Sequence, residues 1–431
     1  MKATQLLIVA MGALCSVGLP AHARSQTPNE LSLEQARTLA RAASPDLIAA
    51  QAAVDAARGR ELQAGAVENP NLTYSTERTS GAGQSNSQQI AGLEQRLEIG
   101  GQRGARRSAS ISRRRAAEAR LAGARALVDF EVARAYAQVI ATERRARLAQ
   151  QASAAFSEAG RVSARRLAAG DISGYADRRL SLEAARYAAL QAEAALAGRS
   201  ARIALSSLIV SPADSIVAAT IILTDSIPAT VPRLDLAMLS AAALRNRADY
   251  QSSMLEAEAL SAEARLASLE RIPSPVLSAG YKTENSAGIS EALNGYAAGL
   301  SFPIPLFDRR RGAIQAAEAD DRRAAVETEA VRRRIAREVA EASDALAAVE
   351  EQRALLAPQL GAPAAAALRS AQVAYSEGEI PLLEWLDAVR AYHEAESAWS
   401  NLLAEFLIRR ATLERVVASR LTELGSIPEN D

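Results

Sequence analysis

Two short stretches mark the places where the chain changes from a strand pattern to a helix pattern. Residues 97–103 read LEIGGQR, and residues 304–310, about 207 positions later, read IPLFDRR. Before each stretch apolar and polar residues alternate, as in a strand with one apolar face. After each stretch comes a long run without proline that is rich in Ala, Arg, Glu and Leu, residues that lose little on entering a helix. The repeated change of period predicts two copies of one structural unit.

A second landmark supports this duplication. Residues 170–172 (GDI) reappear as residues 378–380 (GEI), with nearly the same offset. The stretch between the two copies is rich in Pro, Ser, Thr and Ile, which is typical of a linker. We therefore expect this order of segments: signal peptide 1–23, first copy 24–210, linker 211–232, second copy 233–418 and C-terminal tail 419–431.

The expected signal peptide rests on the first residues of the chain. Lys2 precedes an apolar run at 6–19, and Ala21-His22-Ala23 has the small-x-small form of a cleavage site. The mature chain is then expected to begin at Arg24. Lipidation at Cys15 is disfavoured because Leu14 precedes it, where such a site needs a small residue.

Each copy is expected to contain one β-hairpin, at about residues 71–97 and 276–303. Turn-forming residues at 80–87 and a loop at 285–294 separate the paired runs. The second hairpin ends at Pro303 and Pro305, since proline cannot donate to a β-ladder. The runs of nine or ten residues match the roughly 9–11 residues of a membrane-spanning strand.

Four strands from one chain cannot close a barrel, and open sheet edges are not tolerated in lipid because unpaired backbone groups there are costly. Two chains would supply eight strands, a barrel that side chains fill, whereas three would supply twelve and leave room for a conduit. We therefore predict a homotrimer with a twelve-stranded barrel.

Long helices account for most of the rest of the chain. Residues 102–148 and 309–357 contain no proline, and each would extend roughly 70 Å as a helix. Each is expected to lead into a shorter helical piece and then into a second long helix, at 172–209 and 381–418. The predicted fold class is mainly α, a long coiled-coil tunnel with a membrane β-barrel.

Composition argues against an enzyme and against a nucleic-acid partner. The 50 basic and 50 acidic side chains leave no net charge. Cleavage after Ala23 would leave no cysteine and one histidine, His393, so neither a His/Cys metal cluster nor a thiol nucleophile could be built. His393 is expected to be a packed or solvated helix residue. The arginine runs 113–115 and 332–334 are expected to lie on solvated helix faces with ion pairs.

The glycines after the first hairpin could suggest a phosphate loop, but no Gly-Lys-Ser/Thr follows them. Gly100 and Gly101 are therefore predicted to form the strand-to-helix joint of the first copy. Phe307 and Asp308 are the corresponding joint of the second copy.

Residues 375–388 read YSEGEIPLLEWLDA, and together with the duplicated hairpins and long helices they resemble the TolC family of outer-membrane efflux proteins. The resemblance covers essentially the whole mature chain. It implies a trimeric channel in the cell outer membrane, with its helical tunnel in the periplasm. It also implies docking to an inner-membrane pump, of the resistance-nodulation-division type, through a periplasmic adaptor protein. Residues 97–103 and 303–309 look most like the branch that serves cobalt-zinc-cadmium pumps.

The resemblance also implies a gate at the periplasmic end of the tunnel. The family tyrosine matches Tyr375, and the two gate acids match Glu384 and Asp387, which one helical turn would place on one face. The family's gate arginine falls at Ile380, so the family's salt-bridge latch cannot form here in the same way. The alternatives are core packing for Tyr375 and an ordinary solvated helix face for the two acids.

These observations lead us to expect a passive export duct without a cofactor, embedded in outer-membrane lipid. A periplasmic adaptor is the alternative from another class of protein. Metal ions, organic drugs and a polypeptide exported by type I secretion are all candidate substrates.

Overall fold

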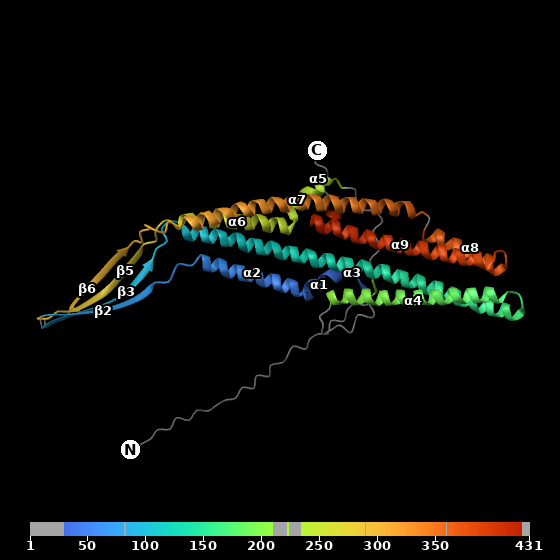
Figure 1. Ribbon diagram of the computed structural model, residues 1–431, viewed down its shortest axis with the longest axis horizontal. Helices are drawn as coiled ribbons and strands as arrows, with labels where there is room; N and C mark the ends of the chain where they lie inside the picture. Colours follow the sequence, from blue (N-terminus) through green and yellow to red (C-terminus); the bar gives the residue numbers. More distant parts are fainter. Residues whose placement is uncertain are drawn as a thin grey trace, which may run out of the picture.

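The computed structural model describes residues 30–424, apart from Ala82, Ile289, Gln359 and the segments 210–221 and 224–233. The expected signal peptide, most of the expected linker and residues 425–431 lie outside the described part of the chain. In the described part, a four-stranded sheet lies at one end of a long helical body (Figure 1). The predicted fold class, mainly helical with two β-hairpins, is confirmed.

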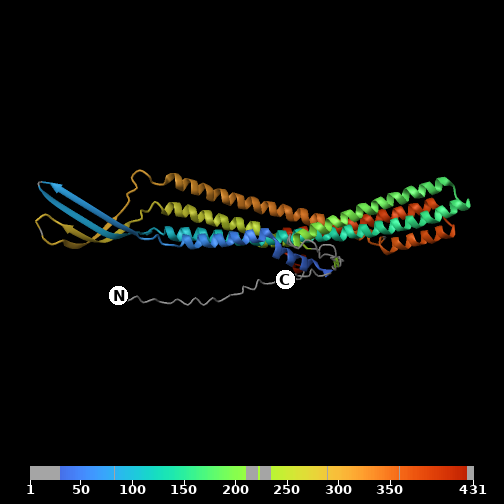
Figure 2. The ribbon, with the colours of Figure 1, turned by 90° about the horizontal axis from the view of Figure 1, so that it is seen from below.

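The first copy starts near the middle of the molecule, runs to the sheet, traverses the helical body and returns to the middle (Figures 1 and 2). Ser32 begins it with a capping box, in which its hydroxyl accepts from the amide of Gln35 and its own amide donates to the Gln35 side chain. Ser44 caps the next helix, which starts at Pro45. The elements in order are α1 (Leu33–Ala43), α2 (Pro45–Ala64), β2 (Asn71–Gly81), β3 (Gln84–Arg96), α3 (Gln102–Ala169) and α4 (Gly174–Ile209).

The second copy follows the same path with one additional helix break. Its elements are α5 (Leu236–Asn246), α6 (Ala248–Leu269), β5 (Val276–Asn285), β6 (Leu293–Ser301), α7 (Arg311–Leu356), α8 (Ala362–Glu377) and α9 (Leu382–Val417), and the short α10 (Leu421–Leu424) follows. Two short strands, β1 (Glu30–Leu31) and β4 (Ile222–Leu223), pair in parallel beside the first copy.

The main sheet has the strand order β2-β3-β5-β6 and is antiparallel throughout. Its register is continuous across the two copies, since Thr76 pairs with Gln89, and Gln89 with Thr283. Within the described residues, one edge of β2 and one edge of β6 have no partner strand. The sheet is therefore open at both sides in a single chain.

The first hairpin turns more tightly than the sequence suggests. Residues 80–87 were expected to form a loop, but the ladder continues to the pair Gly81–Gln84, and β3 begins at Gln84. Polar Ser and Asn side chains suit exposed strand positions as well as loops, so their composition was misleading. Gly83, with φ of 79°, lies in the tight turn that replaces the expected loop.

The two copies differ in their long helices, which is a second departure from expectation. The first copy was expected to break after residue 148, but α3 is one helix of 68 residues. The second copy does break, between α7 and α8, where Pro358 precedes Gly361 at φ of 74° and Pro363 lies in the first turn of α8. The first copy has no proline there, so nothing removes a backbone donor and the helix continues.

Three buried clusters hold the helices together. One lies in the first copy around Val132 and Leu205, one in the second copy around Ile335 and Phe406, and a third joins both copies around Phe156 and Trp385. The long α3 is central, because it packs against α2 and α4 of its own copy and against α6 and α9 of the other. Within the described residues, none of the helices combines the length and the apolar character that crossing a membrane requires.

Candidate functional site

The end of the molecule opposite the sheet is formed by two helix-to-helix turns, α3–α4 and α8–α9 (Figure 2). Gly170 and Gly378 end their helices in the left-handed conformation, with φ of 83° and 80°. The next residues also bond alike, since Asp171 and Glu379 donate their amides to carbonyls of the preceding helix at 2.9 Å. The repeated Gly-acid-Ile sequence thus makes the same turn twice, and we call this end the helical tip.

Aromatic side chains tie the two hairpins of the tip together. Trp385 of α9 lies between Tyr375 of α8 and Phe156 of α3, with ring centroids 5.3 Å and 5.5 Å away. Phe156 in turn stacks on Tyr187 of α4 at 4.3 Å. Few aromatic residues occur in the chain, so their concentration here is informative. Stacked pairs add about 0.5–1.5 kcal/mol beyond burial, and this cluster couples the ends of the two copies.

Tyr375, the predicted gate tyrosine, belongs to this cluster. It is half-buried and stacks on Trp385 with an angle of 19° between the rings. The Arg166 guanidinium carbon lies 6.0 Å from the Tyr375 ring centroid, which joins α3 to α8 across the tip. Within one chain, Tyr375 is therefore packed as a core residue would be, and it also has a cationic neighbour.

Glu384 and Asp387, the predicted gate acids, are both exposed on the first turns of α9, but their surroundings differ. Asp387 lies 3.4 Å from a guanidinium nitrogen of Arg390, one turn later on α9. Arg390 also binds Glu183 of α4, at 2.9 Å. Glu384 lies at the helix N-terminus and has no ion pair in the described structure. The two acids are therefore not electrostatically equivalent.

The position of the family's gate arginine is apolar here. Ile380 is partly buried against the aromatic cluster, so it contributes packing instead of charge. Sequence reasoning missed Arg390 and Arg166, which supply the cationic contacts of the tip, and Glu183, the acidic partner of Arg390. The spacing of Asp387 and Arg390 could have indicated one pair, whereas the contacts to α3 and α4 join residues far apart in sequence.

The joint between sheet and helices is built differently in the two copies. In the first, Gly101 has φ of 82° and directly precedes α3. A Cβ on Gly100 would lie 2.9 Å from the Ile272 side chain. In the second copy, Phe307 is 99% exposed, and Asp308 accepts a 2.8 Å hydrogen bond from the amide of Arg310 just before α7. The sequence thus located both changes from strand to helix correctly, since α3 begins at Gln102 and α7 at Arg311.

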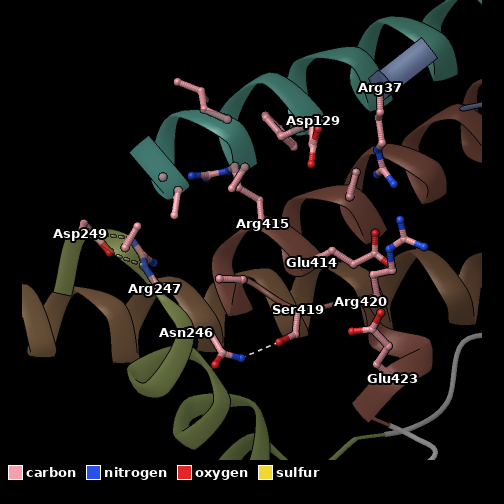
Figure 3. Close-up of a pocket in the computed structure, with 18 of the residues that line it drawn as sticks. Arg37, Asp129, Asn246, Arg247, Asp249, Glu414, Arg415, Ser419, Arg420 and Glu423 are labelled. Atoms are coloured by element: carbon pink, nitrogen blue, oxygen red, sulfur yellow. Dashed lines mark hydrogen bonds and ion pairs between the residues drawn. The ribbon is translucent and has the colours of Figure 1, made fainter. Parts of the chain in front are cut away.

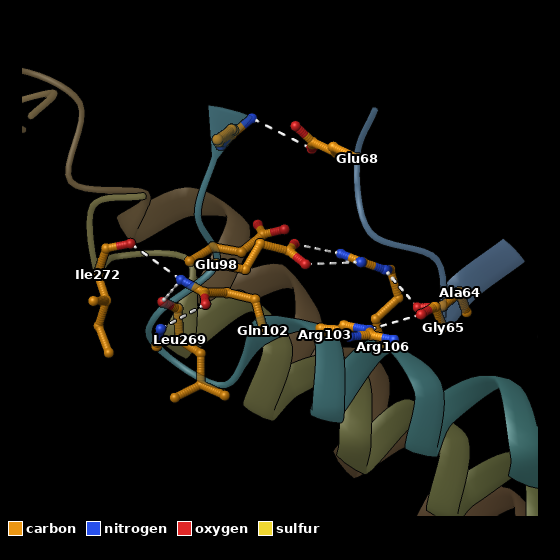
Figure 4. Close-up of polar contacts among 12 residues, drawn as sticks. Ala64, Gly65, Glu68, Glu98, Gln102, Arg103, Arg106, Leu269 and Ile272 are labelled. Carbon is orange, nitrogen blue, oxygen red and sulfur yellow. Dashed lines mark hydrogen bonds and ion pairs between the residues drawn. The ribbon is translucent and has the colours of Figure 1, made fainter. Parts of the chain in front are cut away.

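Polar contacts at the first joint bind it to the rest of the chain (Figure 4). The Gln102 side chain accepts from the Gly100 amide at 2.9 Å and donates to the carbonyls of Leu269 and Ile272 at 3.2 Å. Arg106 donates to both oxygens of Glu98, at 2.7 and 3.0 Å. These hydrogen bonds from Arg106 lower the pKa of the Glu98 carboxyl below its usual value.

His393 and the arginine runs have the structural roles expected for them. The His393 ring meets Tyr187 edge-on at 5.5 Å, and burial lowers the pKa of His393. Arg113 pairs with Glu263, and Arg333 pairs with Glu329 at 3.0 Å. Both arginine runs therefore lie on helix faces with ion pairs.

A charged pocket of about 650 Å³ lies near the middle of the molecule, between α3, α9 and the α5–α6 junction (Figure 3). Its charges are largely matched in pairs: Arg41 with Asp129, Arg247 with Asp249 at 2.7 Å, and Arg420 with Glu34 at 2.7 Å. The pair between Arg420 and Glu34 joins the end of the second copy to α1. We interpret the pocket as an ion-paired seam between the copies.

Comparison with known proteins agrees with this architecture. Residues 36–209 and 239–419 match the family model for outer membrane efflux proteins, one segment in each copy. The chain therefore belongs to the outer membrane efflux protein family.

Individual relatives are similar over nearly their whole length. The cobalt-zinc-cadmium resistance protein CzcC of Cupriavidus metallidurans is 27% identical over 387 residues, which are 90% of each chain. The outer-membrane channel OprN has a TM-score of 0.75 at 21% identity, covering 92% of this chain and 91% of the other. The outer membrane protein VceC of Vibrio cholerae has a TM-score of 0.70 at 21% identity, covering 90% and 96%. The structural likenesses show that the fold is shared with outer-membrane channels.

Proposed function

We propose that this chain is one subunit of a trimeric, passive export duct in the outer membrane. Three four-stranded sheets form a twelve-stranded barrel in the bilayer, and the helices form a tunnel through the periplasm. A periplasmic adaptor and an inner-membrane pump of the resistance-nodulation-division type supply the substrate and the energy. The duct itself performs no chemistry.

The observation that carries this proposal is the open sheet at the end of a long helical body. Strands β2 and β6 each have an unpartnered edge within the described residues, and such edges invite pairing with another chain. Because β2 and β6 run in opposite directions, the β6 edge of one chain fits the β2 edge of the next as an antiparallel pair. Repeating this contact closes a ring of chains.

The helical tip is the proposed gate. Glu384 and Asp387 of three chains face the axis there, and Tyr375 sets the position of α8 through its stack on Trp385. Arg390 replaces the missing family arginine as the cation at the gate, although it binds only Asp387 of the two acids, and within one chain. The gate is then stabilised by contacts between α9 and α4 of the same subunit.

Heavy-metal cations are the proposed substrate class. The support is the likeness to CzcC across 90% of the chain. A duct for organic drugs or for type I secretion would have the same architecture, so the substrate has to be tested separately.

The duct is tested by fractionating cells and measuring conductance. We expect trimers in the outer-membrane fraction that dissociate to monomers on heating, and that form ion channels in planar bilayers. Soluble periplasmic monomers without conductance would contradict the duct and favour the adaptor alternative.

The substrate class is tested by deleting the gene and measuring cellular metal content and drug resistance. We expect more cobalt, zinc and cadmium in cells of the deletion strain, and the wild-type gene should return the metal content to its normal level. Unchanged metal content together with lost drug resistance would assign the duct to drug efflux instead.

A further inference from the structure

Three exposed arginines at the joint between sheet and helices have no acidic partner within the described residues. Arg106 is bound to Glu98, Arg310 to Glu270, and Arg96 lies 3.7 Å from Glu68. By contrast, Arg271, Arg309 and Arg311 are exposed and make no ion pair within the described part of the chain. We call these three residues the arginine collar.

Exposed apolar side chains lie beside the collar. In the segment from β6 to α7, Phe302 is 53% exposed, Ile304 74%, Leu306 65% and Phe307 99%. We call these four residues the apolar rim. A run of large apolar side chains so open to solvent in a single chain indicates a surface that something else covers.

Part of the collar and part of the rim line one groove. It has a volume of about 770 Å³, and Arg271, Arg309 and Ile304 are among the residues that line it. The acids in its lining are mostly neutralised: Glu98 by Arg106 and Glu270 by Arg310. Asp308 remains as an opposing charge, although its carboxylate accepts from the Arg310 amide. Arg271 and Arg309, the two collar arginines that line the groove, outweigh Asp308 and leave the groove positive.

We propose that the arginine collar and the apolar rim bind anionic phospholipid of the membrane leaflet that faces the periplasm. The inference rests on the proposed function, because that function places the sheet in the bilayer. The collar then lies at the depth of the phospholipid headgroups, since Arg271 precedes β5, which starts at Val276, and Arg309 and Arg311 follow β6, which ends at Ser301.

The chemistry of both groups fits this ligand. Guanidinium groups bind phosphate through paired N–H donors, and aromatic side chains concentrate where a membrane meets water. The side chains of the apolar rim would enter the acyl region of the leaflet, while the collar binds the lipid phosphate at the membrane surface. A trimer repeats this set around the barrel, so the contact fixes the depth of the duct in the membrane and favours anionic headgroups.

The test uses the full-length trimer in vesicles with a tryptophan reporter, F307W. Brominated phosphatidylglycerol and brominated phosphatidylcholine serve as the two quenchers. The native Trp385 and Trp399 lie in α9, away from the sheet, so the wild-type protein gives the background. Because each arginine near an anionic surface contributes about fivefold, we expect the reporter to favour phosphatidylglycerol by at least about fivefold. The preference should weaken at high salt.

Two sets of variants distinguish the effect of the collar arginines from the effect of the protein's overall charge. R271Q/R309Q/R311Q should bring the preference close to one, and the triple lysine variant should retain part of it. The matched control is R60Q/R199Q/R322Q, which removes three exposed arginines of the helices that likewise have no ion pair in the described structure. This control should keep the full preference. If F307W lowers the trimer yield, L306W serves as the reporter in its place.

The outcomes distinguish this proposal from the proposed function. Conducting trimers in which neither reporter is quenched, or in which the triple glutamine variant keeps its preference, would overturn the lipid site and leave the duct standing. Loss of adaptor binding in that variant, with lipid preference unchanged, would assign the surface to a protein partner instead. Absence of conducting trimers in the wild-type protein would contradict the duct itself, and the lipid site with it.

Discussion

At the scale of single residues, Glu384 and Asp387 show how one pattern can place two acids in different electrostatic surroundings. Both lie exposed on α9, but only Asp387 has a guanidinium nearby, at 3.4 Å. A charge that is already matched contributes less to the field along a pore than an unmatched one. Glu384 should therefore dominate any cation selectivity of the tip.

This difference predicts unequal effects of two conservative variants. In planar bilayers, E384Q should reduce the preference for cations and the block by divalent ions more than D387N does, since rings of carboxylates select cations. The wild-type trimer is the reference, and trimer yield is checked for each variant. An equal or larger effect of D387N would show that Arg390 does not neutralise Asp387 in the assembled channel.

Gly101 is the residue whose backbone the first joint requires. Its φ of 82° is unfavourable for any residue with a Cβ, so G101A should destabilise the trimer by about 1–2 kcal/mol. Gly104, inside α3, is the control, because a Cβ there would have open space. G104A should be stabilising by about 0.5–1 kcal/mol. Thermal unfolding of both variants measures the difference, and equal stabilities would mean that the joint relaxes.

Glu98 should make the same joint sensitive to acid. Arg106 lowers the pKa of Glu98 in the folded chain, so the stabilising effect is complete above the unfolded value of about 4.3. It is lost as the pH falls through the lower folded value. The wild-type protein should therefore be more stable than E98Q at pH 7, and the difference should shrink as the pH falls below about 4. A difference in unfolding temperature between the wild-type protein and E98Q that does not change with pH would contradict this.

At the scale of elements, the break between α7 and α8 is the main asymmetry between the copies. Glu396 of α9, whose side chain is 3% exposed, fixes the chain at this break through hydrogen bonds. Its carboxylate accepts from the Gly361 amide at 2.7 Å, just before α8, and from Arg144 of α3 at 3.0 Å. A buried acceptor whose removal leaves its donors unpaired is costly to lose.

We predict that E396A destabilises the start of α8 by about 1–3 kcal/mol. Hydrogen exchange should accelerate at the amides of α8 and less in the adjoining part of α9. The control is E405A on the same helix, whose side chain is 42% exposed and, among the described residues, pairs only with Arg409 one turn away, so it should cost at most about 0.5 kcal/mol. Similar exchange in the two variants would remove Glu396 as the anchor of the break.

Local patterns predicted the elements that depend on local chemistry. Alternating residues indicated the four strands, and Gly100 and Gly101 indicated the first joint. The continuity of α3 was missed because the break of the second copy was extended to the first, although Pro358 and Pro363 have no proline counterpart there. The aromatic cluster and the Arg390–Glu183 pair were not predictable, since each brings together helices that are far apart in sequence.

At the scale of the whole molecule, the described chain has the form of a part rather than a closed whole. Its sheet is open at β2 and β6, and its apolar rim is exposed. Both features are costly in a free monomer and are removed when chains pair within a membrane. The sequence indicated this through the number and length of its strands, since four are too few to close a barrel.

Crosslinking the two open edges tests this assembly most directly. A cysteine replaces Thr76 in β2, and a second cysteine is placed in turn at each position of β6, in a chain whose only natural cysteine, Cys15, lies in the expected signal peptide. After oxidation in outer membranes, at least one pair should give covalent dimers and trimers and nothing larger. Monomers alone from every pair, in protein that reaches the outer membrane, or a ladder beyond three chains would contradict the trimeric duct.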